Sequence, residues 1–459
     1  MALCLVPRTI MAWRMPGICP DGVLYIRLGK AIDMGQFQEA AGQIRFNIYP
    51  LILSYLHHLG LAWETAGVAW GVAISSCTVL PLYGWIRRAF SRRVAIAACI
   101  LYAIHSGLVR WSVEIIRDST FWFLLALSLY LLWRAVTELR WAWYLAAGTA
   151  IALACLTRFE GLVLFAPLIA WSWWQLHEGK AHGRRLIAAG LVCASIYPLL
   201  LMLVNALWFH GRTSDLVRTK PVELARDWAQ ESITGQRAVE KQKRIDVLPP
   251  LPLWKMAERF LTGMFKGITP LYLLALLGGI AARGMGFGAS GPSSRLGFGP
   301  PPLNTLHRRA DHDHDHDHDH EYMVPDMVPD MVPDMVPDMV PAHSTLAIAW
   351  RRDGRGLAYA AALVLAAIWI HLYWSHEAGP RYFFPIVLMA APLAGWGLWQ
   401  ISAAVAHRVR RQHSSRTALL AGAAPLAAML VVNLSVAWGG DVRSRVAAVD
   451  LGHWLQEHY

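Results

Sequence analysis

Long apolar stretches alternate with short polar gaps along most of this chain. Each stretch approaches the ~20 residues that an α-helix needs to cross the ~30 Å hydrocarbon core of a bilayer. They lie at residues 65–85, 94–109, 119–133, 142–157, 160–175, 186–208, 268–283, 355–374, 381–400 and 418–437. We therefore predict an all-α, polytopic integral membrane protein with about 10 to 11 transmembrane helices.

The composition also favours a bilayer over water as the surroundings of the chain. Of its 459 residues, 56% are hydrophobic and only 16% are charged, and the mean hydropathy is +0.36. The formal net charge is +11, but the basic residues lie in the gaps between apolar stretches rather than along one helix face. This distribution argues against a nucleic-acid partner and instead indicates a membrane topology signal.

Alternate gaps are rich in arginine and lysine, which fixes the expected orientation. The basic residues of these gaps are Arg87, Arg88, Arg92 and Arg93, then Arg134 and Arg140, then Lys180, Arg184 and Arg185, and finally Arg408, Arg410, Arg411 and Arg416. Short loops with an excess of arginine and lysine face the cytoplasm. The remaining gaps and the segment 16–64 are then expected on the extracytoplasmic face of the cell (inner) membrane.

The pattern divides the chain into segments of different character. Residues 1–64 are predicted to hold a weak N-terminal stretch and a first outer loop, whose apolar spacing indicates amphipathic helices lying in the membrane interface. Transmembrane helices follow over 65–283, with a polar outer loop at 211–255, and again over 345–440. Residues 441–459 resemble the start of an outer domain, and we expect the chain to be incomplete at both ends.

Residues 284–344 form a low-complexity segment, predicted to be a cytoplasmic loop. It contains Asp-His pairs over 311–320 and repeated Met-Val-Pro-Asp over 323–341. Imidazole and carboxylate groups bind Zn²⁺ or Ni²⁺, but a repeat of this kind lacks the fixed geometry of a catalytic metal site. We interpret it as a disordered loop.

The outer gaps collect acidic, guanidinium and phenol side chains. They hold Asp21 with Tyr25, Arg117 with Asp118, Arg158 with Glu160, and Arg381 with Tyr382. Such a set suits a reaction between a lipid-linked anion and an acceptor, because a carboxylate takes the acceptor proton while arginines neutralise the departing phosphate. Asp21 is the candidate base, and the competing interpretation is an N-cap of a helix over residues 22–35.

Two of the arginines also have structural interpretations. Arg158 lies in a turn of a few residues between apolar stretches, where an internal ion pair with Glu160 or Asp118 is as plausible as anion binding. Arg381 follows Gly379 and Pro380, and it either snorkels to the membrane surface or binds a phosphate.

Taken in order, several short motifs resemble the GT-C glycosyltransferases of family 39. They are Asp21-Gly22-Val23-Leu24-Tyr25, Tyr49-Pro50, Arg117-Asp118-Ser119, Leu156-Thr157-Arg158-Phe159-Glu160-Gly161 and Arg381-Tyr382-Phe383-Phe384-Pro385. That family includes dolichyl-phosphate-mannose protein mannosyltransferases and bacterial aminoarabinose transferases that act on lipid A. The likeness extends over most of the chain outside the low-complexity segment.

The resemblance implies a sugar transfer from a polyprenyl-phosphate donor to a lipid, glycan or protein acceptor, with inversion at the anomeric carbon. It implies an essential acid in the first outer loop, where Asp21 falls, and a second acid at Asp118. The residues implied in substrate binding are Tyr25, Arg117, Arg158, Glu160, Arg381 and Tyr382. Some members use a divalent metal, although no firm ligand set is visible in this sequence.

One departure from the family pattern leaves the sugar and the acceptor open. The mannosyltransferases usually carry an Asp-Glu pair, whereas Gly22 follows Asp21 here. A transporter or lipid flippase is the alternative of a different class, although the two halves show no convincing repeat and no matching pair of broken helices. A non-catalytic membrane scaffold would leave Asp21 unexplained.

Overall fold

The computed structural model describes residues 1–165, 183–209, 253–278 and 380–410, apart from 16, 44–45, 139 and 270–271, and short pieces between 414 and 431. Every regular element in these ranges is a helix, which confirms the all-α prediction for this part of the chain. The chain divides into two compact units, Met1–Ile280 with Leu346–Tyr459, and Ala281–Thr345. The second unit, which contains the whole low-complexity segment 284–344, lies outside the described residues.

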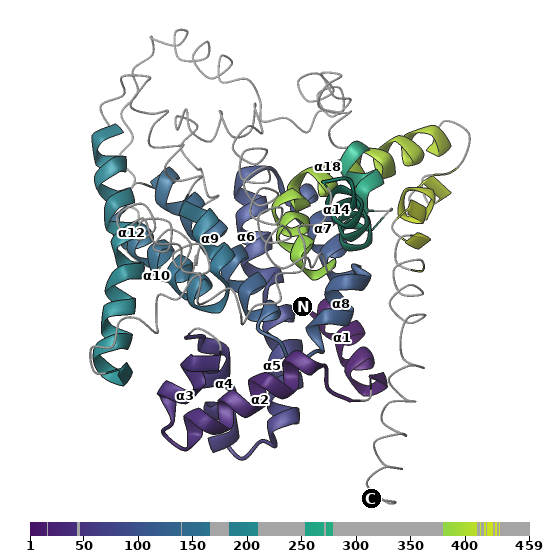
Figure 1. Ribbon diagram of the computed structural model, residues 1–459. Helices are drawn as coiled ribbons and strands as arrows, with labels where there is room; N and C mark the ends of the chain where they lie inside the picture. The colour runs from purple at the N-terminus through teal and green to yellow at the C-terminus, as the bar shows by residue number, and fades with distance from the viewer. Residues whose placement is uncertain are drawn as a thin grey trace, which may run out of the picture. The chain divides into compact units, whose positions relative to one another are not determined.

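Short helices occupy the N-terminal part of the first unit (Figure 1). They are α1 (Ala2–Arg14), α2 (Pro20–Asp33), α3 (Phe37–Gln43) and α4 (Ile48–His58). A polar side chain begins α4: Asn47 accepts a hydrogen bond from the Tyr49 amide at 2.9 Å. Helices therefore form where the sequence predicted amphipathic ones, and their position at a membrane interface stays a prediction.

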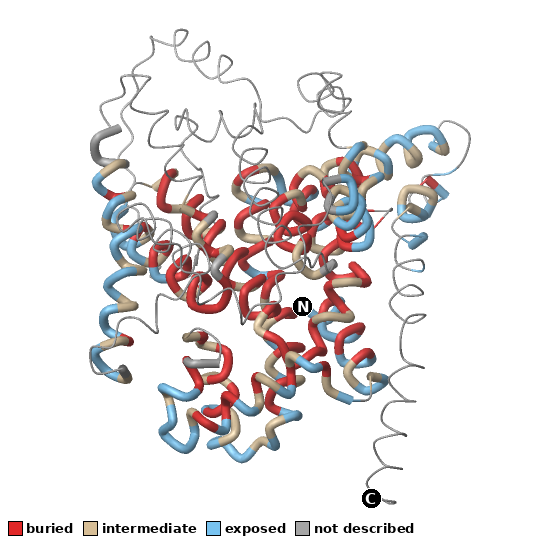
Figure 2. The backbone as a smooth tube through the Cα atoms, viewed as in Figure 1, coloured by how far each residue is buried: buried red, intermediate tan, exposed pale blue. Residues whose placement is uncertain are grey.

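Longer helices and short connecting segments build the rest of the described unit. They are α5 (Trp63–Cys77), α6 (Val79–Ala89), α7 (Arg92–Ile104), α8 (Ser106–Ser112), α9 (Asp118–Glu138), α10 (Trp141–Thr157), η1 (Phe159–Leu164), α12 (Gly183–Val204), η2 (Asn205–Phe209), α14 (Leu253–Ile268), η6 (Pro380–Phe383) and α18 (Phe384–Arg410). The buried positions concentrate in α6, α7, α9, α10 and the first half of α18 (Figure 2). These helices share one hydrophobic core.

Four of the described helices are long and apolar enough to cross a membrane, and there are up to six spans if each bent helix pair counts as one. The four are Trp63–Ala89, Asp118–Glu138, Ile187–Trp208 and Arg381–Arg410. The number of 10 to 11 spans is thus not confirmed. The stretch at 355–374, most of that at 160–175 and half of that at 418–437 lie outside the described residues.

One apolar stretch that was predicted as a single helix is broken, and another was predicted to start too early. The stretch at 94–109 bends by 57° between α7 and α8, because His105 is extended and its Nδ1 accepts a hydrogen bond from the Leu108 amide, which caps a new helix. The helix predicted over 268–283 does not start at residue 268. Helix α14 ends there, at Ile268, and Thr269 has a φ of 54° that no α-helix accommodates.

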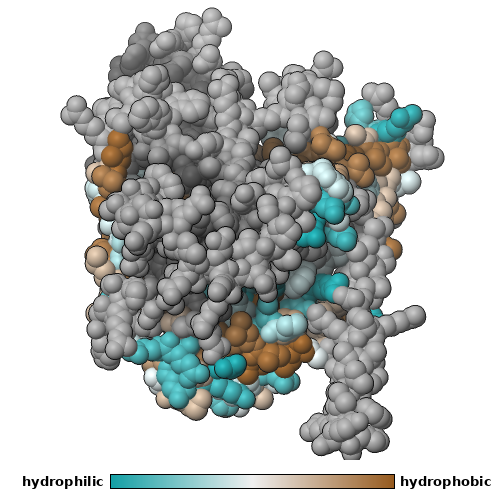
Figure 3. Space-filling model, viewed as in Figure 1, coloured by the Kyte–Doolittle hydropathy of each residue, from teal (hydrophilic) through white to brown (hydrophobic). Residues whose placement is uncertain are grey.

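Helix α12 has the surface expected of a helix that faces lipid. Only 17% of its most apolar window is buried, and large apolar side chains such as Leu191, Leu199 and Met202 are exposed. Apolar side chains are visible where α12 lies, at the left edge of Figure 3. Exposed apolar surface of this extent is stable in a bilayer and costly in water.

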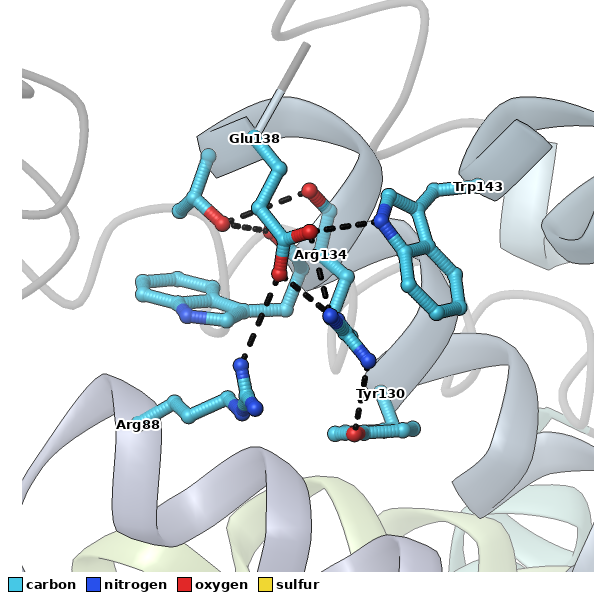
Figure 4. Close-up of polar contacts among 7 residues, drawn as sticks. Arg88, Tyr130, Arg134, Glu138 and Trp143 are labelled. Carbon is cyan, nitrogen blue, oxygen red and sulfur yellow. Dashed lines mark hydrogen bonds and ion pairs between the residues drawn. The ribbon is translucent and has the colours of Figure 1, made fainter. Parts of the chain in front are cut away.

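A polar cluster closes the C-terminal end of α9 (Figure 4). Glu138 accepts hydrogen bonds from Arg134 at 2.6 Å and from Trp143 at 2.6 Å, and Arg88 of α6 lies 3.6 Å from the same carboxylate. Arg88 and Arg134 belong to gaps that the charge pattern placed on one side of the membrane. Since α9 is about 30 Å long at 1.5 Å per residue, its other end, at Asp118, lies far from this cluster.

We predict that Gly395→Ala lowers the stability of the bundle by about 1–3 kcal/mol. A Cβ at Gly395 would lie 2.8 Å from the Ala98 amide nitrogen and 2.8 Å from the Val94 carbonyl oxygen, so α7 and α18 would have to separate. Thermal unfolding of the detergent-solubilised protein measures the loss. The control is Gly278→Ala, whose Cβ meets nothing closer than 3.4 Å; equal melting temperatures for both variants would contradict the prediction.

Candidate active site

The structure brings charged residues from distant segments to the N-terminal end of α9. Asp118 is the first residue of α9, and Arg158 follows the last residue of α10. Asp21 lies in the first turn of α2, and Arg381 lies in η6. Their contacts link positions 40 and 360 residues apart. The outer gaps that hold them therefore meet in one place, and the membrane face on which they lie stays a prediction.

Arg158 is the centre of a buried ionic network. Its Nη1 donates a hydrogen bond to one carboxylate oxygen of Asp118, and its Nη2 donates to Glu160 at 2.6 Å. The exposed fractions of the side chains are 6% for Arg158, 4% for Asp118 and 21% for Glu160. The structural interpretation of Arg158 considered above, an internal ion pair, thus describes its contacts.

The network keeps Arg158 and Glu160 charged. Burial by itself would raise the pKa of Glu160, but the charge and hydrogen bonds of Arg158 outweigh burial and lower that pKa to about 2. Burial would likewise lower the pKa of Arg158, yet Asp118 and Glu160 raise it well above its ordinary value. A guanidinium with two carboxylate partners has little capacity left for a further anion.

A second ion pair is more open to its surroundings. Arg381 Nη1 donates a hydrogen bond to Asp21 Oδ2 at 2.6 Å, and the side chains are 19% and 43% exposed. The Arg381 guanidinium also lies 5.4 Å from the ring centres of both Trp111 and Tyr382. Cation–π contacts of this kind hold the guanidinium plane in position.

The N-cap interpretation of Asp21 was wrong, because Cys19 has that position. The Cys19 sulfur accepts a hydrogen bond from the Gly22 amide at 3.3 Å, and α2 begins at Pro20. Burial, followed by the charge of Glu114, raises the pKa of Cys19 to about 11, so the cap is a neutral thiol. Asp21 is thereby left with its carboxylate directed to Arg381.

The remaining candidate residues surround this cluster. Tyr25 is 6% exposed and packs edge-on against Tyr49; burial, with Arg117 acting in the opposite sense, leaves its pKa raised to about 12. The ring centre of Tyr382 lies 5.1 Å from the Arg158 guanidinium carbon and 5.4 Å from that of Arg381. The guanidinium of Arg117 is half-buried and makes no hydrogen bond or ion pair within the part of the chain that the structure describes.

Two supporting residues were missed at the level of sequence. Asn47 donates a hydrogen bond from Nδ2 to the Thr157 carbonyl oxygen at 2.7 Å, which joins the start of α4 to the turn that carries Arg158. An asparagine just before an apolar helix is a recognised N-cap signal, but nothing local indicates its second bond. The second is Trp111, whose contact with Arg381 no sequence signal indicated.

The acidic residues of the cluster are engaged with arginines rather than arranged around a vacant centre. Asp21, Asp118 and Glu160 each contact a guanidinium. Among the residues that the structure describes, no group of three or more His, Cys, Asp or Glu side chains could hold a metal ion. The described residues thus offer no first-choice ligand set for the divalent metal that some family members use.

A family model matches the central part of the chain. Residues 48–208 match the dolichyl-phosphate-mannose-protein mannosyltransferase family, which confirms the resemblance read from the sequence motifs. The matched residues include Asp118, Arg158 and Glu160, whereas Asp21 and Arg381 lie outside them. No curated protein sequence matches the chain significantly.

Among solved structures, the chain is similar to an oligosaccharyltransferase from Archaeoglobus fulgidus. The apo form has 12% identity and a TM-score of 0.46, over 95% of this chain and 56% of that chain. The archaeal oligosaccharyltransferase AglB from the same organism, in complex with an inhibitory peptide and a dolichol-phosphate, has 12% identity and a TM-score of 0.49, over 95% and 55%. This chain thus spans little more than half the length of these proteins.

We expect the Glu160 ion pair to make stability dependent on acidic pH. Folding lowers the pKa of Glu160 from 4.5 to about 2, so the contribution of the carboxylate is complete above about pH 5 and is lost as the pH falls towards 2. Between pH 6 and pH 3, the wild type should lose about 2 kcal/mol more than Glu160→Gln. Chemical unfolding in detergent measures both slopes, and parallel slopes would contradict the expectation.

Proposed function

We propose that this chain, whose residues 48–208 match the dolichyl-phosphate-mannose-protein mannosyltransferase family, is a membrane glycosyltransferase with a polyprenyl-phosphate sugar as its donor. The observation that carries the proposal is the partly exposed Asp21–Arg381 pair, beside Asp118, Arg158 and Glu160 of the matched region. Transfer from a lipid phosphate requires a base and a phosphate-binding cation close together in one site.

The arginines differ in their capacity to bind the donor phosphate. Arg381 uses one N–H group on Asp21, and the Arg117 guanidinium makes no hydrogen bond or ion pair with the described residues, although its charge acts on Glu160 and Tyr25. Both have further N–H donors for phosphate oxygens, and guanidinium geometry suits bidentate binding of that group. Arg158 contacts two carboxylates, which favours a positioning role for it rather than the direct phosphate contact implied by the resemblance.

Asp21 is the proposed general base. Its side chain is 43% exposed, so an acceptor hydroxyl can reach it, whereas Asp118 is buried and held by Arg158. In the transfer, the acceptor oxygen gives its proton to Asp21 and forms a bond to the anomeric carbon. The bond from that carbon to the phosphate oxygen breaks on the opposite side, which inverts the configuration, and the lipid phosphate leaves against Arg381 and Arg117.

The reaction is proposed to occur on the extracytoplasmic side of the cell (inner) membrane. Support comes from the two ends of α9, since the arginine-rich end at Arg88 and Arg134 is the one that the positive-inside rule assigns to the cytoplasm. The Asp118 end then faces outward. The acceptor is a lipid, a glycan or a protein, and no described feature favours one of them.

We predict that Asp21→Asn reduces sugar transfer from a polyprenyl-phosphate donor by at least ~100-fold, because the amide cannot accept the acceptor proton. Transfer is measured in membranes with a radiolabelled lipid-linked sugar.

The matched control is Asp33→Asn on the same helix. Asp33 contacts His58 and Ser54 rather than Arg381, so that variant should keep its activity. Undiminished transfer by Asp21→Asn, at equal protein level, would exclude Asp21 as the base. A transporter or flippase would show no transfer in either protein.

A further inference from the structure

The Asp21–Arg381 contact joins the proposed base to the proposed phosphate-binding cation before any donor is bound. We propose that the donor phosphate displaces Asp21 from Arg381, so that binding of the lipid phosphate is the event that frees the base. The inference rests on the proposed function and deepens it. It makes donor binding a condition for activation of the acceptor.

Arg381 is the fixed partner in this exchange. Its side chain is 19% exposed, and its guanidinium lies against the rings of Trp111 and Tyr382. The two aromatic rings hold the guanidinium by cation–π contact and use none of its N–H groups, so N–H groups beyond the one bound to Asp21 remain for anions. A cation held in this way binds successive anions without moving far.

Asp21 is the movable partner. The side chain is short and 43% exposed, and within the described residues its carboxylate accepts one hydrogen bond, at Oδ2 from Arg381. It lies in the first turn of α2, where unpaired backbone N–H groups favour a negative charge. A displaced carboxylate therefore keeps a favourable environment close to its original position.

The charges of the cluster favour displacement over sharing. A phosphate bound bidentately to Arg381 would place a second anion within a few ångströms of Asp21 on one guanidinium, and like charges at such distances repel strongly in a partly buried site. Arg158 cannot neutralise the second anion, because Asp118 and Glu160 already bind its guanidinium. The carboxylate, being the more exposed and less fixed anion, is the one that leaves.

Release has a chemical consequence at a named atom. While Oδ2 of Asp21 accepts the hydrogen bond from Arg381, that bond competes with an acceptor hydroxyl for the same oxygen and holds the carboxylate against Arg381. After exchange, the oxygen is free at the moment when the phosphate, and with it the anomeric carbon, is in place. The contact thus couples readiness of the base to occupancy of the donor site.

The test is a binding experiment that needs no sugar transfer. Farnesyl phosphate is titrated by calorimetry into the full-length protein in detergent, with farnesol and inorganic phosphate as the two parallel ligands. The proteins are the wild type, Asp21→Asn, Arg381→Gln, the double variant, and Asp33→Asn as a charge control. All are first compared by thermal unfolding to establish that they fold.

Because Asp21 competes with the phosphate, Asp21→Asn should bind farnesyl phosphate about fivefold more tightly than the wild type, as expected for loss of a partly exposed ion pair. In the Arg381→Gln background the same change should alter affinity less than about twofold, since no contact remains to be displaced. Asp33→Asn should match the wild type. A parallel gain for inorganic phosphate supports exchange at the phosphate group itself.

Equal or weaker binding by Asp21→Asn would overturn the exchange and leave the proposed function standing. The same holds for an equal gain in the Arg381→Gln background, because the effect would then be one of net charge alone. By contrast, if the wild type bound farnesyl phosphate no more tightly than farnesol, the proposed function itself would fail.

Discussion

A buried arginine has to be neutralised, and the described site is organised around that requirement. Arg158 is 6% exposed and has carboxylates of α9 and η1 as partners. A guanidinium at this depth is tolerated only when its charge is paired and its N–H groups are bonded. The ends of α9 and α10 and the turn after α10 are thereby fixed relative to one another, and Asn47 adds α4 to the same point.

The cluster contains two kinds of ion pair that serve different purposes. The ion pairs of Arg158 are buried, and two carboxylates occupy its guanidinium. These pairs therefore fix the relative positions of the helix ends that carry them. The Arg381–Asp21 pair is partly exposed and singly bonded, so it can exchange partners at modest cost. The proposed transfer from a lipid phosphate needs both properties, namely a rigid frame and one anion site that opens to the substrate.

Much of the helical architecture followed from apolar periodicity, but its breaks did not. Asp118–Glu138 coincides closely with the stretch predicted at 119–133. The bend between α7 and α8 arises because the His105 side chain caps the following helix, and Gly107 gives room for Phe384, which would lie 2.6 Å from a Cβ there. Capping by a histidine and close packing from a distant helix leave no clear mark in hydropathy.

The sequence by itself determined that the chain suits a bilayer, that it is helical, and which charged residues gather in alternate gaps, because these properties depend on local composition and on a period of 3.6 residues. The turn after α10 offered Arg158 a pair with Glu160, two residues away, but only tertiary structure decided that Asp118 joins this pair and that Arg381 pairs with Asp21. That Arg158 is saturated while Arg381 shares a single contact with Asp21 depends on partners 40 and 360 positions away. Such pairing is set by how the helices pack, and no local preference of the chain encodes it.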